Sequence, residues 1–545
     1  MDGTAVEHPM PVLDALRTQA GDLRAFGRYA RELPGFLSRP LRPEQAEAMV
    51  AAALARRDVA LVGLLHRIQA SPRNPYRRLL EHAGVEPGDV GPLVAEHGVE
   101  GSLSRLYDAG VHLTAGELKG QTPVTRAGLA SFTVAADDLD NPLAGGAAVG
   151  TTGSSGVPRR ARFELAALGH EAAHQHIALH AGGVEAHDLA LWRPVPPGIA
   201  GLNDVLRNGH LGRPIVRWFS QFPTGAGSGQ LRHAALVAAT RAIAARAGVP
   251  VARPEHVPVD RAHVVAAWLA AHDRPVFLNT TSSSGVRVAA AARERDLDIA
   301  GTVFRLGGEP FTDERERRLA EIGCRAIVHY SMTETGRIAN ACAEPSTRDD
   351  VHVLLDKLGV VTRPRRLADG SEVEALYYTP LLPGSAKALV NIESDDYGRL
   401  EERDCACPLG RLGLRLHLHS IRSLSKLNSE GMTFGGEALL SLVERVLPTR
   451  FGGGPSDWQL VEEVHDGLSR VVVIASPRIG PVDERAVTDA VLECLAEGAD
   501  WLRLQARLWR EGGTVVVRRA EPHVTAAGKV LPFSPPRPAP SRPAG

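Results

Sequence analysis

The run Gly150–Arg162, GTTGSSGVPRRAR, has the composition of a loop that binds phosphate. Glycines let backbone N–H groups approach phosphate oxygens, hydroxyl side chains add hydrogen-bond donors, and the arginines that follow supply counter-charge. The run lacks the Gly-Lys-Ser/Thr of a Walker A loop and the Gly-x-Ser-x-Gly of a nucleophile elbow. Composition alone leaves a Gly/Ser-rich surface loop as an alternative.

A second chemical pattern is the run His170–His174, HEAAH, in a segment predicted to be helical. Two histidines four residues apart share one face of a helix, as in zinc proteases, so a zinc hydrolase is an alternative function. The longer form of that motif needs a glycine where this chain has Ile177, and a helix that continues past Ile177 carries His180 away from the other two. A solvated helix face explains the pair as well, and so does a place in the lining of a substrate pocket.

The glycine-rich run resembles the phosphate-binding signature of the adenylate-forming superfamily, and the chain as a whole resembles its phenylacetate–CoA ligase branch. The matching residues are Thr151, Thr152, Gly153, Ser154, Ser155 and Gly156, with Arg159 where the family has lysine. A second hydroxyl-rich run at 280–287 lacks the early glycine and the proline of that signature. The resemblance implies an α/β fold: a large N-terminal adenylation domain with βα sheet layers, plus a small C-terminal α+β domain.

The next motif in the family's order implies an adenine site. Gly308, Glu309 and Pro310 resemble the Gly-Gly/Ser-Glu-Pro segment that forms part of this site, and glycines there allow the backbone to approach a flat ring. Tyr330 begins a run that resembles Tyr-x-x-Ser/Thr-Glu, whose tyrosine ring flanks the adenine.

The remaining motifs imply contacts to the phosphates, the ribose and the reacting carboxylate. Thr333 resembles the hydroxyl residue that contacts the α-phosphate, and Glu334 the Mg²⁺ ligand, a role that suits a hard carboxylate oxygen. Asp396 and Arg422 resemble the two residues that bind the ribose. Lys529, in Thr-x-x-Gly-Lys, resembles the lysine that bridges the carboxylate and the α-phosphate, and it is one of only five lysines among 62 basic residues. Read singly, each motif also fits a turn or a solvated side chain.

Four further residues imply a structural zinc site. Some members of the phenylacetate–CoA ligase branch hold zinc with a cysteine, a following histidine and a later Cys-x-Cys, a layout matched by Cys342, His352, Cys405 and Cys407. Three cysteines and one histidine form a closed tetrahedral shell that leaves no position for catalysis. Ordinary buried cysteines beside a surface histidine are the alternative.

The implied activity is ATP-dependent activation of a carboxylic acid, aromatic by analogy with the branch, to an acyl-adenylate, followed by transfer to CoA. The expected cofactors and partners are ATP, Mg²⁺, a small carboxylic acid and CoA. Leu424 stands where the family's hinge has Asp or Lys, and Gly431 resembles the glycine near the CoA channel, so adenylation is better supported than thioester formation. Alternatives are a carrier-protein thiol, a protein side chain or an amine as acceptor, and a nucleotide-binding protein without catalysis.

The pattern of predicted helices and strands divides the chain into four parts. Residues 1–120 show helical spacing, and 121–421 alternate short apolar runs with Ala/Arg-rich helices, as βα units do. Residues 422–531 combine strands and a helix, and we expect a small mobile domain there. The Pro-rich end, 532–545, is predicted to be a disordered tail.

Bulk properties exclude several classes of function. A net charge of −1 argues against nucleic acid and anionic membranes as partners. The chain lacks a secretory signal pattern and an uncharged apolar run of about 20 residues, which predicts a cytoplasmic protein without a membrane span. Five cysteines do not make a disulfide scaffold for 545 residues, and Cys324 and Cys494 are predicted to lie in the core. A homodimer is one option for its assembly.

Overall fold

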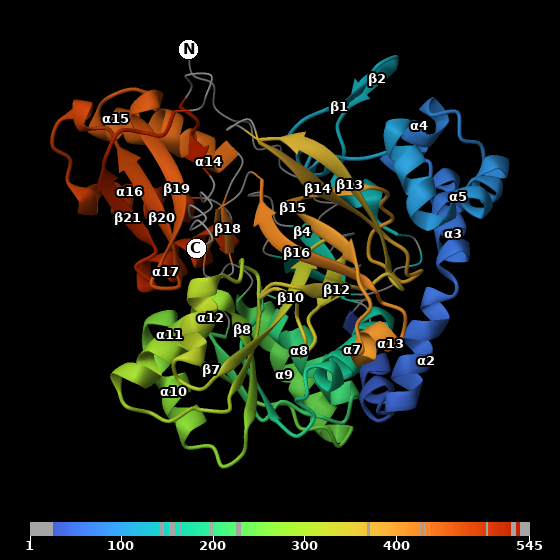
Figure 1. Ribbon diagram of the computed structural model, residues 1–545, viewed down its shortest axis with the longest axis horizontal. Helices are drawn as coiled ribbons and strands as arrows, with labels where there is room; N and C mark the ends of the chain where they lie inside the picture. The colour runs from blue at the N-terminus through green and yellow to red at the C-terminus, as the bar shows by residue number, and fades with distance from the viewer. Residues whose placement is uncertain are drawn as a thin grey trace, which may run out of the picture.

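A computed structural model describes residues 26–534 apart from short gaps (Figure 1). The gaps are residues 142, 144–146, 152–158, 164, 197, 199, 225–229, 368–370, 425–426, 430–431, 435–436, 498–499 and 525–529.

The described N-terminal residues are helical, as their spacing predicts. The helices are α2 (Pro43–Leu54), α3 (Arg57–Ala70), α4 (Pro75–His82), α5 (Pro87–Asp108) and the short α6 (Ala115–Leu118). Helix α4 shows why its ends fall where they do: Asn74 accepts a hydrogen bond from the backbone of Tyr76, and Gly84 takes a positive φ of 69° just past the end. Figure 1 shows this layer on the opposite side of the molecule from the C-terminal unit.

One half of the central twelve-stranded sheet is parallel. Its strands run in the order β10-β9-β8-β5-β6-β7, all pairs parallel. Their bounds are β5 (Asp188–Trp192), β6 (Arg217–Ser220), β7 (Pro254–His256), β8 (Val276–Thr281), β9 (Val303–Gly307) and β10 (Arg325–Met332). The helices are α7 (Leu165–Ala181), α8 (Ala200–His210), α9 (Gln230–Arg246), α10 (Ala262–Ala270), α11 (Ser282–Glu294) and α12 (Asp313–Ala320). This half confirms the predicted βα units.

The other half of the sheet is antiparallel, and here the predicted βα alternation up to residue 421 is wrong. Strands β11 to β16 follow one another with only the four-residue helix α13 (Pro408–Arg411) between them. Their bounds are β11 (Gly336–Asn340), β12 (Val351–Val353), β13 (Leu358–Arg366), β14 (Glu372–Pro380), β15 (Ile392–Glu402) and β16 (Leu416–Ser423). Connections of this kind suit antiparallel neighbours, whereas a parallel crossover needs a dozen or more residues.

Three two-stranded sheets stand apart from the central one. They are β1 (Val124–Arg126) with β2 (Leu129–Phe132), β3 (Ala147–Thr151) with β4 (Arg159–Phe163), and β17 (Leu427–Ser429) with β18 (Met432–Phe434).

The C-terminal unit is a four-stranded sheet with helices, in agreement with the predicted α+β pattern. The strand order is β21-β20-β19-β22. The elements are α14 (Glu437–Ser441), α15 (Leu447–Phe451), β19 (Trp458–His465), β20 (Leu468–Ala475), α16 (Glu484–Ala496), α17 (Asp500–Glu511), β21 (Val515–Arg519) and β22 (Phe533–Ser534). Trp458 and Trp509 are fully buried in a core of its own.

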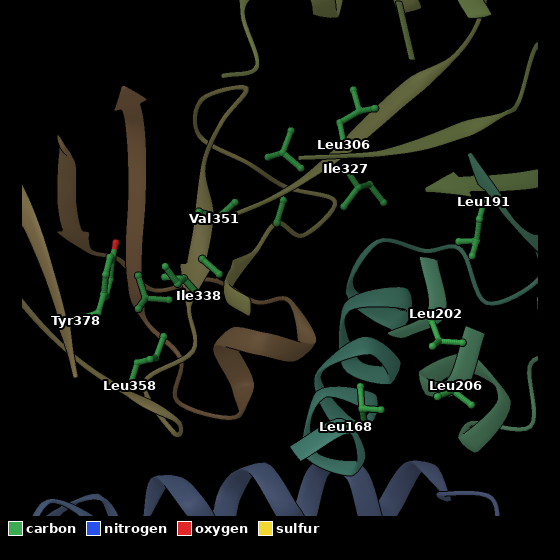
Figure 2. Close-up of a cluster of buried hydrophobic side chains, with 14 of the residues drawn as sticks. Leu168, Leu191, Leu202, Leu206, Leu306, Ile327, Ile338, Val351, Leu358 and Tyr378 are labelled. Carbon is green, nitrogen blue, oxygen red and sulfur yellow. The ribbon is translucent and has the colours of Figure 1, made fainter. Parts of the chain in front are cut away.

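The main core lies between the sheet and its helices. Leu168 from α7, Leu202 and Leu206 from α8, Leu306 of β9 and Ile327 of β10 all belong to this core, part of which Figure 2 shows. Burial of this apolar surface fixes α7 and α8 against the sheet. Within the part of the chain that the structure describes, no helix is long and apolar enough to cross a membrane.

Candidate functional site

The phosphate-loop motif falls on the hairpin β3–β4. Thr151 and Arg159 end the two strands and are paired across the ladder. Thr152, Gly153, Ser154, Ser155 and Gly156, which connect them, lie outside the described residues, and so does Lys529. The roles assigned to these residues stay predictions.

The predicted adenine and ribose residues meet, although their strands, β10 and β15, are not neighbours in the sheet. The Tyr330 hydroxyl, from β10, donates a 2.7 Å hydrogen bond to Oδ2 of Asp396 in β15, and Ser423 donates a 2.9 Å bond to Oδ1. Asp396 is only 8% exposed, and burial raises the pKa of Tyr330 well above its usual value, so the phenol stays a donor.

The backbone before Asp396 has an unusual shape. Asp395 adopts a φ of +61°, in the left-handed region that aspartate tolerates better than most side chains. The Ser394 hydroxyl accepts a 3.2 Å hydrogen bond from the Asp396 N–H. This bond stabilises the turn that positions Asp396.

Arg422 lies beside this pair but contacts another carboxylate. It stands opposite Tyr397 in the β15–β16 ladder, one position from the pairing of Asp396 with Ser423. Its guanidinium is 3.5 Å from Oδ2 of Asp349 and donates to its own neighbour's carbonyl, that of Ile421. Among the described residues, the ion pair of Arg422 is therefore with Asp349.

Thr333 and Glu334 form the turn between β10 and β11. Thr333 is exposed and Glu334 half-buried. The turn closes at Gly336, whose φ is +73°, and a Cβ there would stand 2.7 Å from a carboxylate oxygen of Glu171. Because Gly336 has no side chain, Glu171 of helix α7 can lie close to the turn.

Gly308, Glu309 and Pro310 follow β9, and Glu309 points into the interface with the C-terminal unit. Its fully buried side chain forms a 2.7 Å ion pair with Arg315. Arg315 also donates to the Gly467 carbonyl and the Ser469 hydroxyl, each at 2.8 Å. The sequence analysis missed this junction, because the pattern around Arg315 is that of an ordinary charged helix.

Cys342, His352, Cys405 and Cys407 come together, with all ligand atoms within 4.8 Å of one another. The sulfurs of Cys342 and Cys405 are 3.9 Å apart, and the sulfur of Cys407 is 3.3 Å from Nε2 of His352. A tetrahedral zinc ion would place such pairs about 3.8 Å and about 3.5 Å apart. The four residues therefore have the spacing of a structural zinc site.

The surroundings of this cluster suit a metal. His352 donates from Nδ1 to the Leu414 carbonyl at 2.7 Å, which leaves Nε2 as the ligand atom. Backbone N–H groups of Glu344 and Gly410 reach the sulfurs of Cys342 and Cys407 at 3.4 Å. Hydrogen bonds from Cys342 and His352 hold the pKa of Cys407 below its usual value, whereas the same contact with Cys407, together with burial, raises the pKa of Cys342.

The histidines of the HEAAH motif form a second cluster, with Asp356. Nε2 of His170 is 2.7 Å from Oδ2 of Asp356, and Nε2 of His174 is 2.9 Å from the same oxygen. All three side chains are buried, so the interpretation as a solvated helix face is wrong. Helix α7 runs on past Ile177, and His180 pairs with Glu185 at the surface, as the missing glycine predicts.

Comparison with known proteins supports the fold. No protein-family model and no curated protein matches the sequence. A solved structure of 2-hydroxyisobutyryl-CoA ligase, in complex with 2-HIB-AMP and CoA in the thioesterification state, matches with a TM-score of 0.55 and 17% identity over 88% of this chain and 90% of that one. The same ligase in the postadenylation state with 2-HIB-AMP gives a TM-score of 0.46 and 17% identity, over 91% and 90% of the chains.

A double mutant of o-succinylbenzoate CoA synthetase from Bacillus subtilis matches with a TM-score of 0.38 and 13% identity, over 71% of this chain and 68% of that one.

Proposed function

Since the chain has the fold of the adenylate-forming superfamily, we propose that it uses ATP to convert a carboxylic acid to an acyl-adenylate and then transfers the acyl group to CoA. The observation that carries the proposal is the 2.7 Å hydrogen bond between Tyr330 and Asp396, two residues 66 positions apart that belong to different motifs of the family. The contact joins β10 and β15, which are not neighbours in the sheet.

The nucleotide would lie beside Tyr330 and Asp396. The Asp396 carboxylate accepts hydrogen bonds from Tyr330 and Ser423 and would be the acceptor for the ribose hydroxyls. Arg422, on the neighbouring strand, lies within reach of the same sugar. Arg159 and the hydroxyl residues of the glycine-rich run would hold the phosphates.

The half-buried Glu334 is the carboxylate assigned to Mg²⁺, which offsets the charge of the phosphates when bound. Gly336, in the same turn, leaves room for the Glu171 carboxylate, because a Cβ there would stand 2.7 Å from one of its oxygens. Cys342, His352, Cys405 and Cys407 would hold a structural zinc that joins β12 to the segment before β16, away from the chemistry.

The reaction proceeds in two displacements. A carboxylate oxygen of the acid attacks the α-phosphorus of ATP, the bond to the β-phosphate oxygen breaks, and pyrophosphate leaves. A thiolate sulfur, that of CoA, then attacks the acyl carbon, and AMP leaves. Lys529 would stabilise the negative charge that gathers between the carboxylate and the α-phosphate in the first step. The acid is proposed to be aromatic, from the resemblance to the phenylacetate–CoA ligase branch.

ATP–pyrophosphate exchange over a panel of carboxylic acids tests the proposal. We expect Lys529→Ala to lower the exchange rate at least about 100-fold, the scale of losing one key electrostatic group. Lys387→Ala is the matched control, because Lys387 pairs with Asp140 in a partly buried ion pair and has no assigned role. Exchange that is absent across the panel in the wild-type protein would instead support a nucleotide-binding protein without catalysis.

AMP release with and without CoA tests the second step. Release that depends on CoA supports the ligase. Exchange without CoA-dependent release would point to another acceptor, such as a carrier-protein thiol or an amine.

A further inference from the structure

A cluster of buried basic side chains lies between the helices α7 and α8 and the sheet. We call it the arginine cluster. It consists of the buried Arg207, Arg305, Arg337 and Lys357 and the half-buried Arg193, with the carboxylates Glu171 and Asp204. Leu168, Leu202 and Leu206 of the same two helices belong to the apolar core of Figure 2, so charged and apolar residues occupy one layer.

The two carboxylates of the cluster already have hydrogen-bond and ion-pair partners within it. Arg207 binds both of them: it donates to Glu171 at 2.7 Å and also contacts Asp204. The other Asp204 oxygen accepts from Asn279 at 2.8 Å, and Lys357 lies 4.0 Å from Glu171. Asp356, a further carboxylate that interacts with Lys357, is held by His170 and His174.

Three arginines keep a positive charge without a carboxylate partner. Arg305 donates to the side-chain oxygens of Gln175 and Asn340, and Arg337 donates to the same Asn340 oxygen at 3.3 Å. Arg193 is 3.5 Å from Nε2 of His329. Among the described residues, none of the three forms an ion pair. Five cations thus face three carboxylates, counting Asp356, and two positive charges stay uncompensated.

Buried charge of this kind is costly, because neither water nor an anion stabilises it. Burial and the neighbouring Arg305 and Arg207 hold the pKa of Arg337 well below its usual value, and burial lowers the pKa of Arg305 to about 9. Buried polar atoms also lack partners among the described residues: Nε of Arg193, Nδ1 of His329 and Nδ2 of Asn340. Unsatisfied groups that cluster in one place indicate a site for a ligand.

The cluster lies across one strand from the nucleotide residues. Successive residues of a strand point to opposite faces, so His329 and Tyr330 of β10 separate the two regions. Tyr330 reaches Asp396, whereas a Cβ at Gly307 would stand 2.5 Å from Nε2 of His329, on the side of Arg193. Glu171 connects the cluster to the turn that carries Glu334, through Gly336.

We propose that the arginine cluster binds a second anionic group of the substrate, so that the acid activated by this protein is a dicarboxylic acid. This inference rests on the proposed function: the carboxylate to be activated lies near the Glu334 turn, and the far carboxylate lies against Arg305 and Arg337. Guanidinium groups suit this task because their planar N–H forks match a carboxylate.

Pyrophosphate exchange with matched pairs of acids tests the substrate class. Suitable pairs are hexanoate with adipate and benzoate with terephthalate. We expect kcat/KM at least about 100-fold higher for the dicarboxylate of a pair, because a buried site built for a polar group rejects an analogue that lacks it. Arg337→Gln should remove this preference. Arg325→Gln, at the exposed opposite end of β10, should keep it. Wild-type protein that prefers the monocarboxylates overturns the proposal.

Thermal unfolding without ATP tests the same site independently of catalysis. We expect adipate to raise the Tm of the wild-type protein more than hexanoate does, and to have no such effect on Arg337→Gln. Without ligand, Arg337→Gln should be more stable than wild type, because it removes an uncompensated buried charge. A Tm that falls in the variant, with no response of wild type to adipate, overturns the proposal.

The two measurements separate the two proposals. Exchange with monocarboxylates and no response to adipate rejects the dicarboxylate site alone. Stabilisation by adipate without any exchange rejects the adenylation and keeps the anion site.

Discussion

Two buried clusters of potential metal ligands lie along helix α7, and they differ in what holds them together. In the cluster of Cys342, His352, Cys405 and Cys407, two pairs of ligand atoms stand 3.3 and 3.9 Å apart, contacts in which a thiol forms only a weak hydrogen bond. In the cluster of His170, His174 and Asp356, the nitrogen–oxygen distances are 2.7 to 3.0 Å, which are ordinary hydrogen bonds.

The difference follows from the partner that each histidine meets. Thiols are weak hydrogen-bond donors, so three of them and an imidazole gain little from one another and leave a centre for an ion. A carboxylate accepts hydrogen bonds from both imidazoles and satisfies them directly. The two histidines of HEAAH, a sequence typical of metal sites, are therefore hydrogen-bonded to Asp356. The three cysteines and His352, which are far apart in the sequence, have the geometry of a metal site.

Loss of zinc is the largest expected effect. We expect about one zinc ion per purified chain and none in Cys407→Ser, since structural zinc contributes about 10 kcal/mol or more to folding in small sites. Elemental analysis and thermal unfolding measure both. Cys324→Ser, at a buried cysteine outside the cluster, should keep its zinc. Fully folded wild-type protein without zinc would contradict the assignment.

Removal of Asp356 is the next largest change. Asp356→Ala leaves two buried imidazoles without their acceptor, and we expect the free energy of unfolding to fall by about 3–5 kcal/mol, as when one partner of a buried pair is removed. Chemical denaturation measures it. Asp188→Ala removes the partner of the half-exposed His272 and should cost about 1 kcal/mol or less.

The zinc content of the purified protein tests whether only the cysteine cluster binds metal. It should not change in Asp356→Ala. A second equivalent of zinc in wild type that disappears in this variant would break the distinction between the clusters.

A pH dependence is the smallest expected effect. Burial lowers the pKa of His174, so the unfolded chain binds a proton below about pH 6.5 when the folded one does not. Stability therefore falls as pH drops from 7 to 5, by at most about 2 kcal/mol from this group. Burial would raise the pKa of Asp356, but His174 and His170 lower it, so its own contribution is lost only at more acidic pH.

Denaturation at pH 7 and pH 5 in His174→Gln measures the difference from wild type. The variant should lose less stability on acidification. His180→Gln changes an exposed histidine of the same helix and should keep the wild-type dependence. An equal loss in all three proteins would show that His174 is protonated in the folded state.

The motifs could be predicted from the sequence because each is a short local pattern of residue types. Tyr330, Asp396 and the four residues proposed to hold zinc could be chosen from the sequence. The structure brings Tyr330 to Asp396 and, separately, the four proposed ligands to one another. The antiparallel half of the sheet was not readable, because strands β11 to β16 are individually apolar or mixed runs whose partners are set by connection length. The ion pair of Glu309 with Arg315 was missed for a similar reason.

By itself the sequence determined the order of the motifs, the helical start and the α+β end of the chain, because these depend on residue type and spacing over a few turns. Only the tertiary structure decided which charges are buried and what they meet. Arg305 contacts Gln175, 130 residues away, and nothing in its own neighbourhood distinguishes it from a solvated arginine. The free energy of a charge is set by the dielectric and the partners around it, and both come from packing between distant segments.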